Sequence, residues 1–275
     1  MVTRHISGHN GVRLEVTDLG PADAPAIVLL HGWSQAALSW ARQHPLAEDF
    51  RLIIPDLRGH GQSDKPDTPD AYGSQAFADD VEAIIAELGL TAATLVGWSM
   101  GGWVVGDYIR HHGDAALAGF ALVGSSVASG KALPAAALEE RQSDPAIAAA
   151  GMFSGTLVDN LTDTAAFLRA CFHQQPDPQD FEQMMGFNML CPLHARAMRR
   201  RNDDFTADYA RTTKPALVIR GKHERLSLPQ MHAQILQTLP RAQAFEYENS
   251  GHAPFWEEAA RFNTDLANFV REAQP

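Results

Sequence analysis

The segment Gly97-Trp98-Ser99-Met100-Gly101 constrains the fold of this chain more than any other. An apolar run at 93–96 precedes it, and a helical pattern at 100–111 follows its serine. Small residues around the serine allow a strand to turn sharply into a helix, which lifts the hydroxyl clear of the backbone. We therefore expect Ser99 to face a cleft, with the first N–H groups and the dipole of the helix directed at whatever reacts there.

Short apolar segments alternate with segments of helical spacing along most of the chain. We expect strands at 12–16, 26–30, 51–54, 93–96, 120–123, 216–219 and 243–247, and helices at 77–88, 100–111, 229–239 and 257–271. This alternation predicts an α/β fold with a mostly parallel central sheet and helices on both faces. The first two strands are expected to form an antiparallel hairpin at the sheet edge.

The interval 130–207 interrupts this alternation. It contains helical patterns at 136–141, 164–172, 181–187 and 195–201 and no convincing strand. A wholly helical insertion between two core strands suggests a cap over the strand ends. We therefore divide the chain into a core, residues 1–129 and 208–275, and a helical cap insertion, residues 130–207.

Composition bounds the class of partner. The chain has 275 residues, of which 45% are hydrophobic, enough for one α/β domain with an insertion. Its net charge of −11, with acidic residues spread along the chain, argues against nucleic acid and anionic membranes as partners. The one basic run, Arg199-Arg200-Arg201, is followed by Asp203-Asp204 and is interpreted as the solvated end of a helix.

Cysteine usage and the N-terminal residues bear on location. Cys171 and Cys191 lie in apolar surroundings and are expected to be reduced packing residues. The N-terminus lacks the apolar region of a signal peptide, and no apolar run is long enough to span a bilayer. These features favour a cytoplasmic protein that is not embedded in a membrane.

Three further segments supply groups that could act with Ser99. The run 29–33 ends an early strand, and it would place the Trp33 amide together with the Met100 amide at an oxyanion hole. Taken alone, this run is more simply interpreted as a loop with a buried aromatic residue. His252 follows the last strand, between a glycine and a proline-containing turn, where a general base could lie. Glu224 lies three residues past the glycine that follows the strand 216–219.

These groups together predict nucleophilic catalysis. His252 would remove the Ser99 proton during attack on a carbonyl and return it to the leaving group. Glu224 would fix the tautomer of His252 and stabilise its charged form. The order Ser99, Glu224, His252 along the chain matches the α/β-hydrolase arrangement. The sequence therefore predicts a serine hydrolase that forms an acyl-enzyme on Ser99.

Four motifs carry a resemblance to the α/β-hydrolase superfamily across nearly the whole chain. They are His31-Gly32-Trp33 and the segments 56–63, 97–102 and 251–255. The resemblance implies the α/β-hydrolase fold with a variable helical cap, no cofactor, and cleavage of a small carboxylic ester or lactone. Within the superfamily the sequence is similar to small carboxylesterases, pimeloyl-carrier-protein methyl ester esterases, N-acyl homoserine lactone hydrolases and cofactor-free haloperoxidases.

The acid position departs from the usual pattern of the superfamily, in which it is Asp. Glu224 is longer by one methylene group, and a glutamate here resembles the acyl homoserine lactone hydrolases. The alternative is that Glu224 pairs with Arg225 at the surface. The catalytic role is favoured because the segment 124–126, after the preceding strand, offers no acid.

Several alternatives remain at this stage. Lactone hydrolysis and perhydrolysis, with apparent haloperoxidase activity, could use the same groups, and a ligand receptor could use the same scaffold. Dehalogenase and epoxide hydrolase functions are disfavoured because their elbow carries Asp. No metal-binding motif is present, and His60, between two glycines, is expected to hold its loop by hydrogen bonds.

Aromatic residues suggest where an apolar acyl group would bind. Trp33, Trp98, Phe153 and Phe187 are the candidate substrate-binding residues. Apolar residues at helical spacing in the insertion more often pack its own interior, but those above the site would face the ligand.

Overall fold

The computed structural model describes residues 1–197 and 201–274. Its centre is an eight-stranded sheet in the order β1-β2-β4-β3-β5-β6-β7-β8. From β4 to β8 in this order, each strand is parallel to its neighbours on that side of the sheet, which confirms the mostly parallel α/β fold. The strands are β1 (Val2–Ser7), β2 (Arg13–Leu19), β3 (Ala26–Leu30), β4 (Arg51–Pro55), β5 (Ala93–Trp98), β6 (Leu117–Val123), β7 (Ala216–Gly221) and β8 (Gln243–Tyr247).

The edge hairpin differs from the prediction. β2 pairs antiparallel with β1 and β4, whereas β3 lies inside the sheet, parallel to β4 and β5. β1 was not predicted, because Ile6 is its one buried side chain and the strand therefore has no apolar periodicity. All five side chains of β3 are buried, as expected for a strand covered on both faces.

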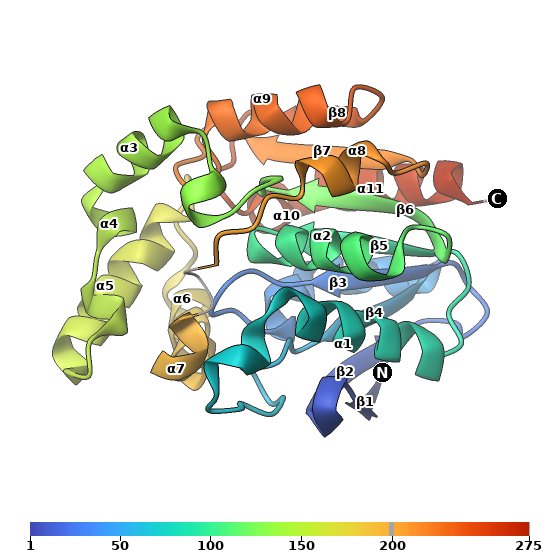
Figure 1. Cartoon of the computed structure of the whole chain (residues 1–275), viewed down its shortest axis with the longest axis horizontal. Helices are drawn as coiled ribbons and strands as arrows, with labels where there is room; N and C mark the ends of the chain where they lie inside the picture. The colour runs from blue at the N-terminus through green and yellow to red at the C-terminus, as the bar shows by residue number, and fades with distance from the viewer. Residues whose placement is uncertain (198–200, 275) are drawn as a thin grey trace.

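Helices cover both faces of the sheet (Figure 1). Amphipathic spacing explains the packing of the last helix, which buries Phe262, Leu266, Phe269 and Val270 at intervals of four, three and one residues. One face carries η2 (Ala37–Glu48), α10 (Pro254–Glu257) and α11 (Ala259–Ala273), and the other α1 (Ser74–Glu87), α2 (Met100–His112), α8 (Thr206–Ala210) and α9 (Pro229–Thr238). The turns η1 (His9–Gly11) and η3 (Pro69–Tyr72) lie in loops of the N-terminal half.

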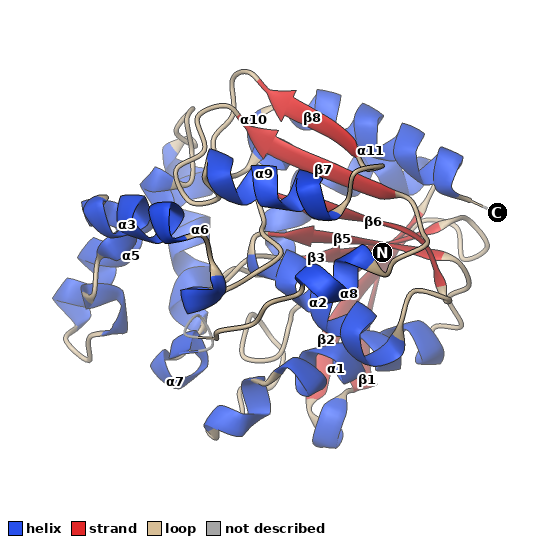
Figure 2. Cartoon of the chain, turned by 45° about the horizontal axis from the view of Figure 1, so that its top comes forward, coloured by secondary structure: helices blue, strands red, loops and turns tan. Residues whose placement is uncertain are grey.

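The predicted helical insertion follows β6. Figure 2 shows its helices on the side toward which β7 and β8 point, beyond the carboxyl ends of the parallel strands. It comprises η4 (Gly130–Ala132), α3 (Ala135–Ser143), α4 (Pro145–Ala148), η5 (Gly151–Phe153), α5 (Leu157–Ala170), α6 (Pro178–Leu190) and α7 (Leu193–Arg196). The helix expected at 195–201 does not reach Arg201, which lies outside any helix; residues 198–200 are outside the described residues.

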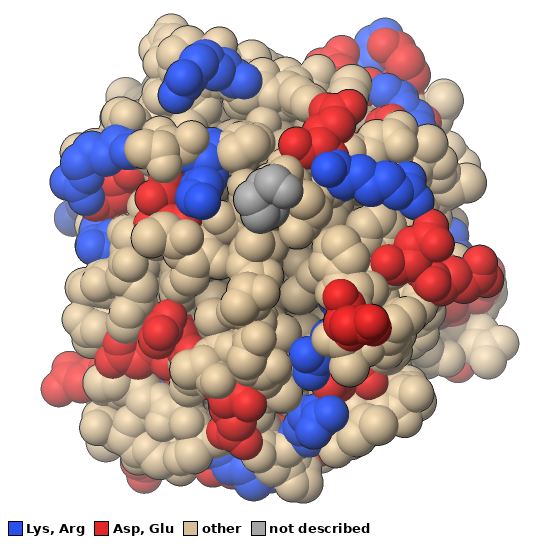
Figure 3. All heavy atoms as spheres, turned by 90° about the vertical axis from the view of Figure 1, so that its right-hand side faces the viewer, with Lys and Arg blue, Asp and Glu red and all other residues tan. Residues whose placement is uncertain are grey.

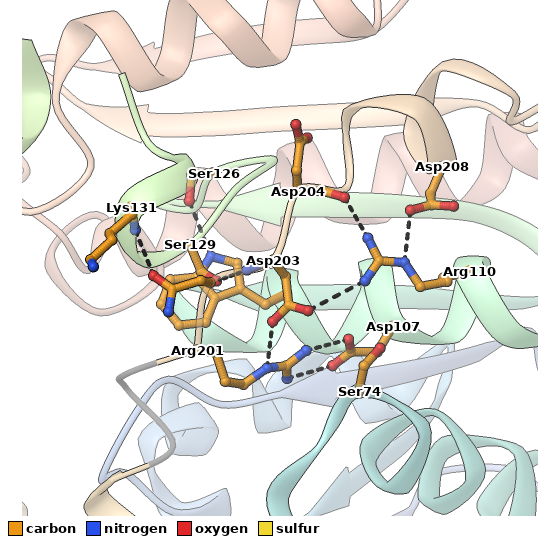
Figure 4. A network of polar contacts seen from close by, with 12 residues as sticks. Ser74, Asp107, Arg110, Ser126, Ser129, Lys131, Arg201, Asp203, Asp204 and Asp208 are labelled. Carbon is orange, nitrogen blue, oxygen red and sulfur yellow. Dashed lines mark hydrogen bonds and ion pairs between the residues drawn. The ribbon is translucent and has the colours of Figure 1, made fainter. Parts of the chain in front are cut away.

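The segments that leave and re-enter the core lie side by side, with a β-bridge between Ala128 and Asp204 (Figure 4). Arg201 donates from its two Nη atoms to the buried Asp107 of α2, at 2.7 and 2.5 Å, and from Nε to Asp203 at 2.7 Å. The predicted solvated position is therefore wrong for Arg201, because the buried carboxylate requires a cation. The other two arginines of that run lie outside the described residues.

Acidic and basic side chains are interspersed over the face shown in Figure 3. None of the described helices combines the length and apolar character needed to cross a bilayer.

Candidate active site

Ser99 lies at the turn between β5 and α2 with a strained backbone, φ 54° and ψ −117°. The turn requires glycine on both sides, because a Cβ on Gly97 would lie 2.4 Å from the carbonyl carbon of Gly101. A Cβ on Gly101 would lie 2.2 Å from the carbonyl oxygen of Leu30. Disfavoured backbone geometry of this kind clusters at functional sites, where the surrounding structure holds it.

His252 and Glu224 form a buried pair. Nδ1 of His252 lies 2.7 Å from Oε2 of Glu224, and Oε1 of Glu224 accepts a hydrogen bond from the Leu226 amide at 2.7 Å. A carboxylate accepts hydrogen bonds, so this geometry favours the tautomer of His252 in which Nδ1 carries the proton and Nε2 is an acceptor. Arg225 pairs instead with Asp144 at 2.6 Å, so the alternative surface pair with Glu224 is wrong.

Ser99 and His252 line one small pocket of about 40 Å³. The turn before residue 33 also passes beside the serine, because a Cβ on Gly32 would lie 3.3 Å from the Ser99 Cβ. The helix begins at Met100, so the amide of this residue has no acceptor within the helix. The other lining residues are Trp33, Met100, Trp103, Gly124, Ser125, Ser126, Arg141, Phe167, Leu226, Ser227 and Met231.

Gly124, which the sequence analysis did not single out, supports the His252–Glu224 pair. It has a left-handed φ of 52° at the end of β6. A Cβ there would lie 3.1 Å from Nδ1 of His252 and 3.2 Å from Oε2 of Glu224. A glycine directly after a buried strand was the available signal, but only the tertiary structure shows what it faces.

The loop that carries His252 is held from the helical insertion. The backbone amide of His252 donates a hydrogen bond to the carbonyl oxygen of Cys171 at 2.8 Å. Glu257 accepts from the amides of Gly251, at 2.7 Å, and His173, at 2.8 Å, and so joins the loop to the insertion. Burial raises the pKa of the Glu257 carboxyl. The position of the histidine therefore depends on contacts with both parts of the chain.

Two buried histidines hold the loops beside the site. Nε2 of His31 accepts from the Leu57 amide, and Nε2 of His60 accepts from the Ser34 amide, both at 3.0 Å. Burial lowers the pKa of His31 to about 4 and that of His60 to about 3, so both rings are neutral at neutral pH. The predicted hydrogen-bonding role of His60 is confirmed.

The four candidate substrate-binding residues separate into two pairs. Trp33 lines the pocket and packs against Phe153 with 5.7 Å between ring centroids. Trp98 and Phe187 are not among the described residues that line this pocket. Trp98 packs against Phe255, at 4.8 Å, and Phe187 lines a separate pocket against the N-terminal strands.

Two other expectations concern cysteines and metals. Cys171 and Cys191 are both buried thiols that form no disulfide, as expected for reduced residues that pack in the interior. Over residues 1–197 and 201–274, no three His, Cys, Asp or Glu side chains are grouped as a metal site would need.

Comparisons with known proteins bear on the family of the fold. Residues 25–259 match the family model described as alpha/beta hydrolase fold. The structure resembles that of a Burkholderia cenocepacia protein assigned as an aryl esterase, with 31% identity over 99% of both chains and a TM-score of 0.88. It also resembles the esterase RhEst1 from Rhodococcus sp. ECU1013, with 28% identity over 100% of both chains and a TM-score of 0.85.

A third relative is the non-heme chloroperoxidase of Streptomyces lividans, 27% identical over 97% of this chain and 99% of that protein. The family model covers most of the chain, including the serine turn and the His252 loop. The chain therefore belongs to the α/β-hydrolase fold family.

Proposed function

We propose that this protein hydrolyses a carboxylic ester through an acyl-enzyme on Ser99. The observation that carries the proposal is the buried His252–Glu224 pair, 2.7 Å apart, at the pocket that the serine also lines. His252 accepts the Ser99 proton as Oγ attacks the ester carbonyl, then donates it to the alcohol that leaves. Water reverses these steps and releases the acid. Glu224 orients the imidazole and stabilises its charge.

The oxyanion of the tetrahedral intermediate would be held by the amides of Met100 and Trp33. The first is supported by its place at the start of α2, and the second by the close approach of Gly32 to the serine. In well-studied hydrolases each such donor contributes about 2.7–4 kcal/mol to transition-state stabilisation.

Ester hydrolysis is favoured over the alternatives by the two esterase structures that match the full chain. A lactone is a cyclic ester and could use the same groups. Perhydrolysis, in which peroxide replaces water, would be a side reaction, and the chloroperoxidase relative makes it worth testing. A receptor without turnover would have no use for both the serine and the buried histidine–carboxylate pair.

The test is kcat for p-nitrophenyl esters in Ser99→Ala and Glu224→Gln variants. Ser99→Ala should remove nearly all turnover and all labelling by a fluorophosphonate. Glu224→Gln should lower kcat by up to about 10⁴-fold, because an amide cannot compensate the imidazolium charge. The matched control is Glu248→Gln, which removes an exposed ion pair with Lys222 and should leave kcat unchanged. Wild-type kcat in folded Glu224→Gln would remove this residue from the proposal.

A further inference from the structure

Arg141 of α3 lies at the junction of two cavities. It lines the pocket that contains Ser99 and His252, and it lines an adjoining cavity of about 390 Å³ that is formed by residues of the insertion together with Trp103. The other residues of the adjoining cavity are mostly apolar and include Leu133, Ile147 and Phe153. A guanidinium is therefore present where a substrate bound at the serine would extend into apolar space.

The Arg141 side chain has no partner among the described residues. Every other described arginine except the exposed Arg241 has a carboxylate, a carbonyl oxygen or an aromatic ring as partner. The nearby Arg225, for example, pairs with Asp144. The lack of a partner is thus a property of this position and not of the arginines in general.

Among the described residues, the carboxylate whose charge acts on Arg141 is already engaged. This is Glu224, whose oxygens bind the ring of His252 and the amide of Leu226. Burial lowers the pKa of the Arg141 guanidinium. A half-buried cation without a counter-ion is costly to the fold, so a protein that keeps one beside its reactive serine is expected to use it.

We propose that Arg141 binds a free carboxylate on the substrate, so that the preferred ester carries a second, ionised acid group. This inference rests on the proposed ester hydrolysis at Ser99. A guanidinium presents paired N–H donors that match the two oxygens of a carboxylate. The apolar cavity would hold the hydrocarbon part of the same molecule. The carboxylate is bound and not consumed, and the bond that breaks is the ester bond at Ser99.

The site would therefore prefer an acidic ester to a neutral one. Half-esters of linear dicarboxylic acids, such as monoethyl adipate, have this chemistry. Ethyl hexanoate has the same number of acyl carbons and no charge, so it is the matched neutral substrate. Neutral acyl lactones would leave the guanidinium without a counter-ion in the complex and are expected to be poorer substrates.

The experiment measures kcat/KM for both esters in wild type, Arg141→Gln, Arg141→Lys and the control Arg225→Gln. Arg141→Gln should lower kcat/KM for monoethyl adipate by about 10- to 100-fold, the range expected for a charged hydrogen-bonded contact. The value for ethyl hexanoate should change by less than about 3-fold. Arg141→Lys should recover part of the loss, and Arg225→Gln, which removes a surface cation, should match wild type with both esters.

A second readout does not depend on turnover. In Ser99→Ala, adipate binding measured by calorimetry should weaken at least 10-fold when Arg141→Gln is added. Equal losses with both esters would overturn the inference, because they would mean that Arg141 supports Glu224 or the fold. No change with either ester would also overturn it. The proposed function fails separately, if wild type hydrolyses neither ester or if Ser99→Ala remains active.

Discussion

Nε1 of Trp98 donates a hydrogen bond to the carbonyl oxygen of His252 at 2.8 Å. The residue directly before the serine thus holds the loop that carries the histidine, although the two are far apart in sequence. The indole also packs 5.7 Å from the imidazole between ring centroids. Trp98 was predicted to bind substrate, but it is not among the described residues that line the serine pocket, and its indole contacts the His252 loop.

Trp98→Phe is expected to lower kcat by about 10-fold with little change in KM. The substitution keeps most of the ring packing but leaves the buried carbonyl oxygen of His252 without its donor, so the histidine is held less tightly. The control is Trp256→Phe, because Nε1 of Trp256 has no acceptor among the described residues. Equal effects of the two substitutions on kcat would contradict the positioning role.

Gly124→Ala is expected to lower kcat by more than its loss of stability alone would. The added Cβ would press on the His252–Glu224 pair and force alanine into a left-handed conformation that costs about 1–2 kcal/mol. Gly113→Ala is the matched control, since Gly113 has a φ of 75° with no atom within 4 Å of an added Cβ. Both variants should lose stability in urea, and kcat should fall only in Gly124→Ala.

Arg201→Gln is expected to destabilise the fold by about 3–5 kcal/mol. It leaves the Asp107 carboxylate buried in α2 without its cation. The control is Arg211→Gln, which breaks an ion pair whose arginine is 68% exposed and should cost less than about 1 kcal/mol. Urea unfolding monitored by circular dichroism gives both free energies of unfolding. A cost below 1 kcal/mol for Arg201→Gln would contradict the buried-pair assignment.

The buried histidines should make the fold less stable in acid. In the native state the pKa of His31 is about 4 and that of His60 about 3, whereas an unfolded histidine has a pKa of about 6.5. As pH falls from 6.5 toward 4, the unfolded chain binds protons that the native chain does not, so the free energy of unfolding decreases. The expected loss between pH 7 and 5 is about 2 kcal/mol for each histidine.

His60→Asn tests this pH dependence. The variant should be less stable at pH 7, because it loses hydrogen bonds to the backbone, but its stability should fall less between pH 7 and 5. Replacing the exposed His5 by Asn controls for the loss of a histidine. If His60→Asn loses as much free energy of unfolding between pH 7 and 5 as the wild type does, His60 does not contribute to the pH dependence.

Local patterns predicted much of the fold. The strands at 93–96 and 216–219 and the helix at 100–111 are all present, because a run of apolar residues or a helical spacing is a property of neighbouring residues. Strand pairing is not local. The antiparallel partner of β2 is the mostly exposed β1, which has no periodic pattern, and β3 is taken into the interior of the sheet.

Local sequence was enough to predict the serine turn, with its two required glycines, and the chain order of serine, glutamate and histidine. Both are written in short motifs whose backbone geometry depends on adjacent residues. The tertiary structure confirmed the predicted contact of Glu224 with His252 and ruled out the alternative pair with Arg225. It also brought Arg201 against the buried Asp107 and placed Arg141 in the serine pocket. The last two relationships join residues far apart in the chain and depend on packing of the whole fold, so no local pattern indicated them.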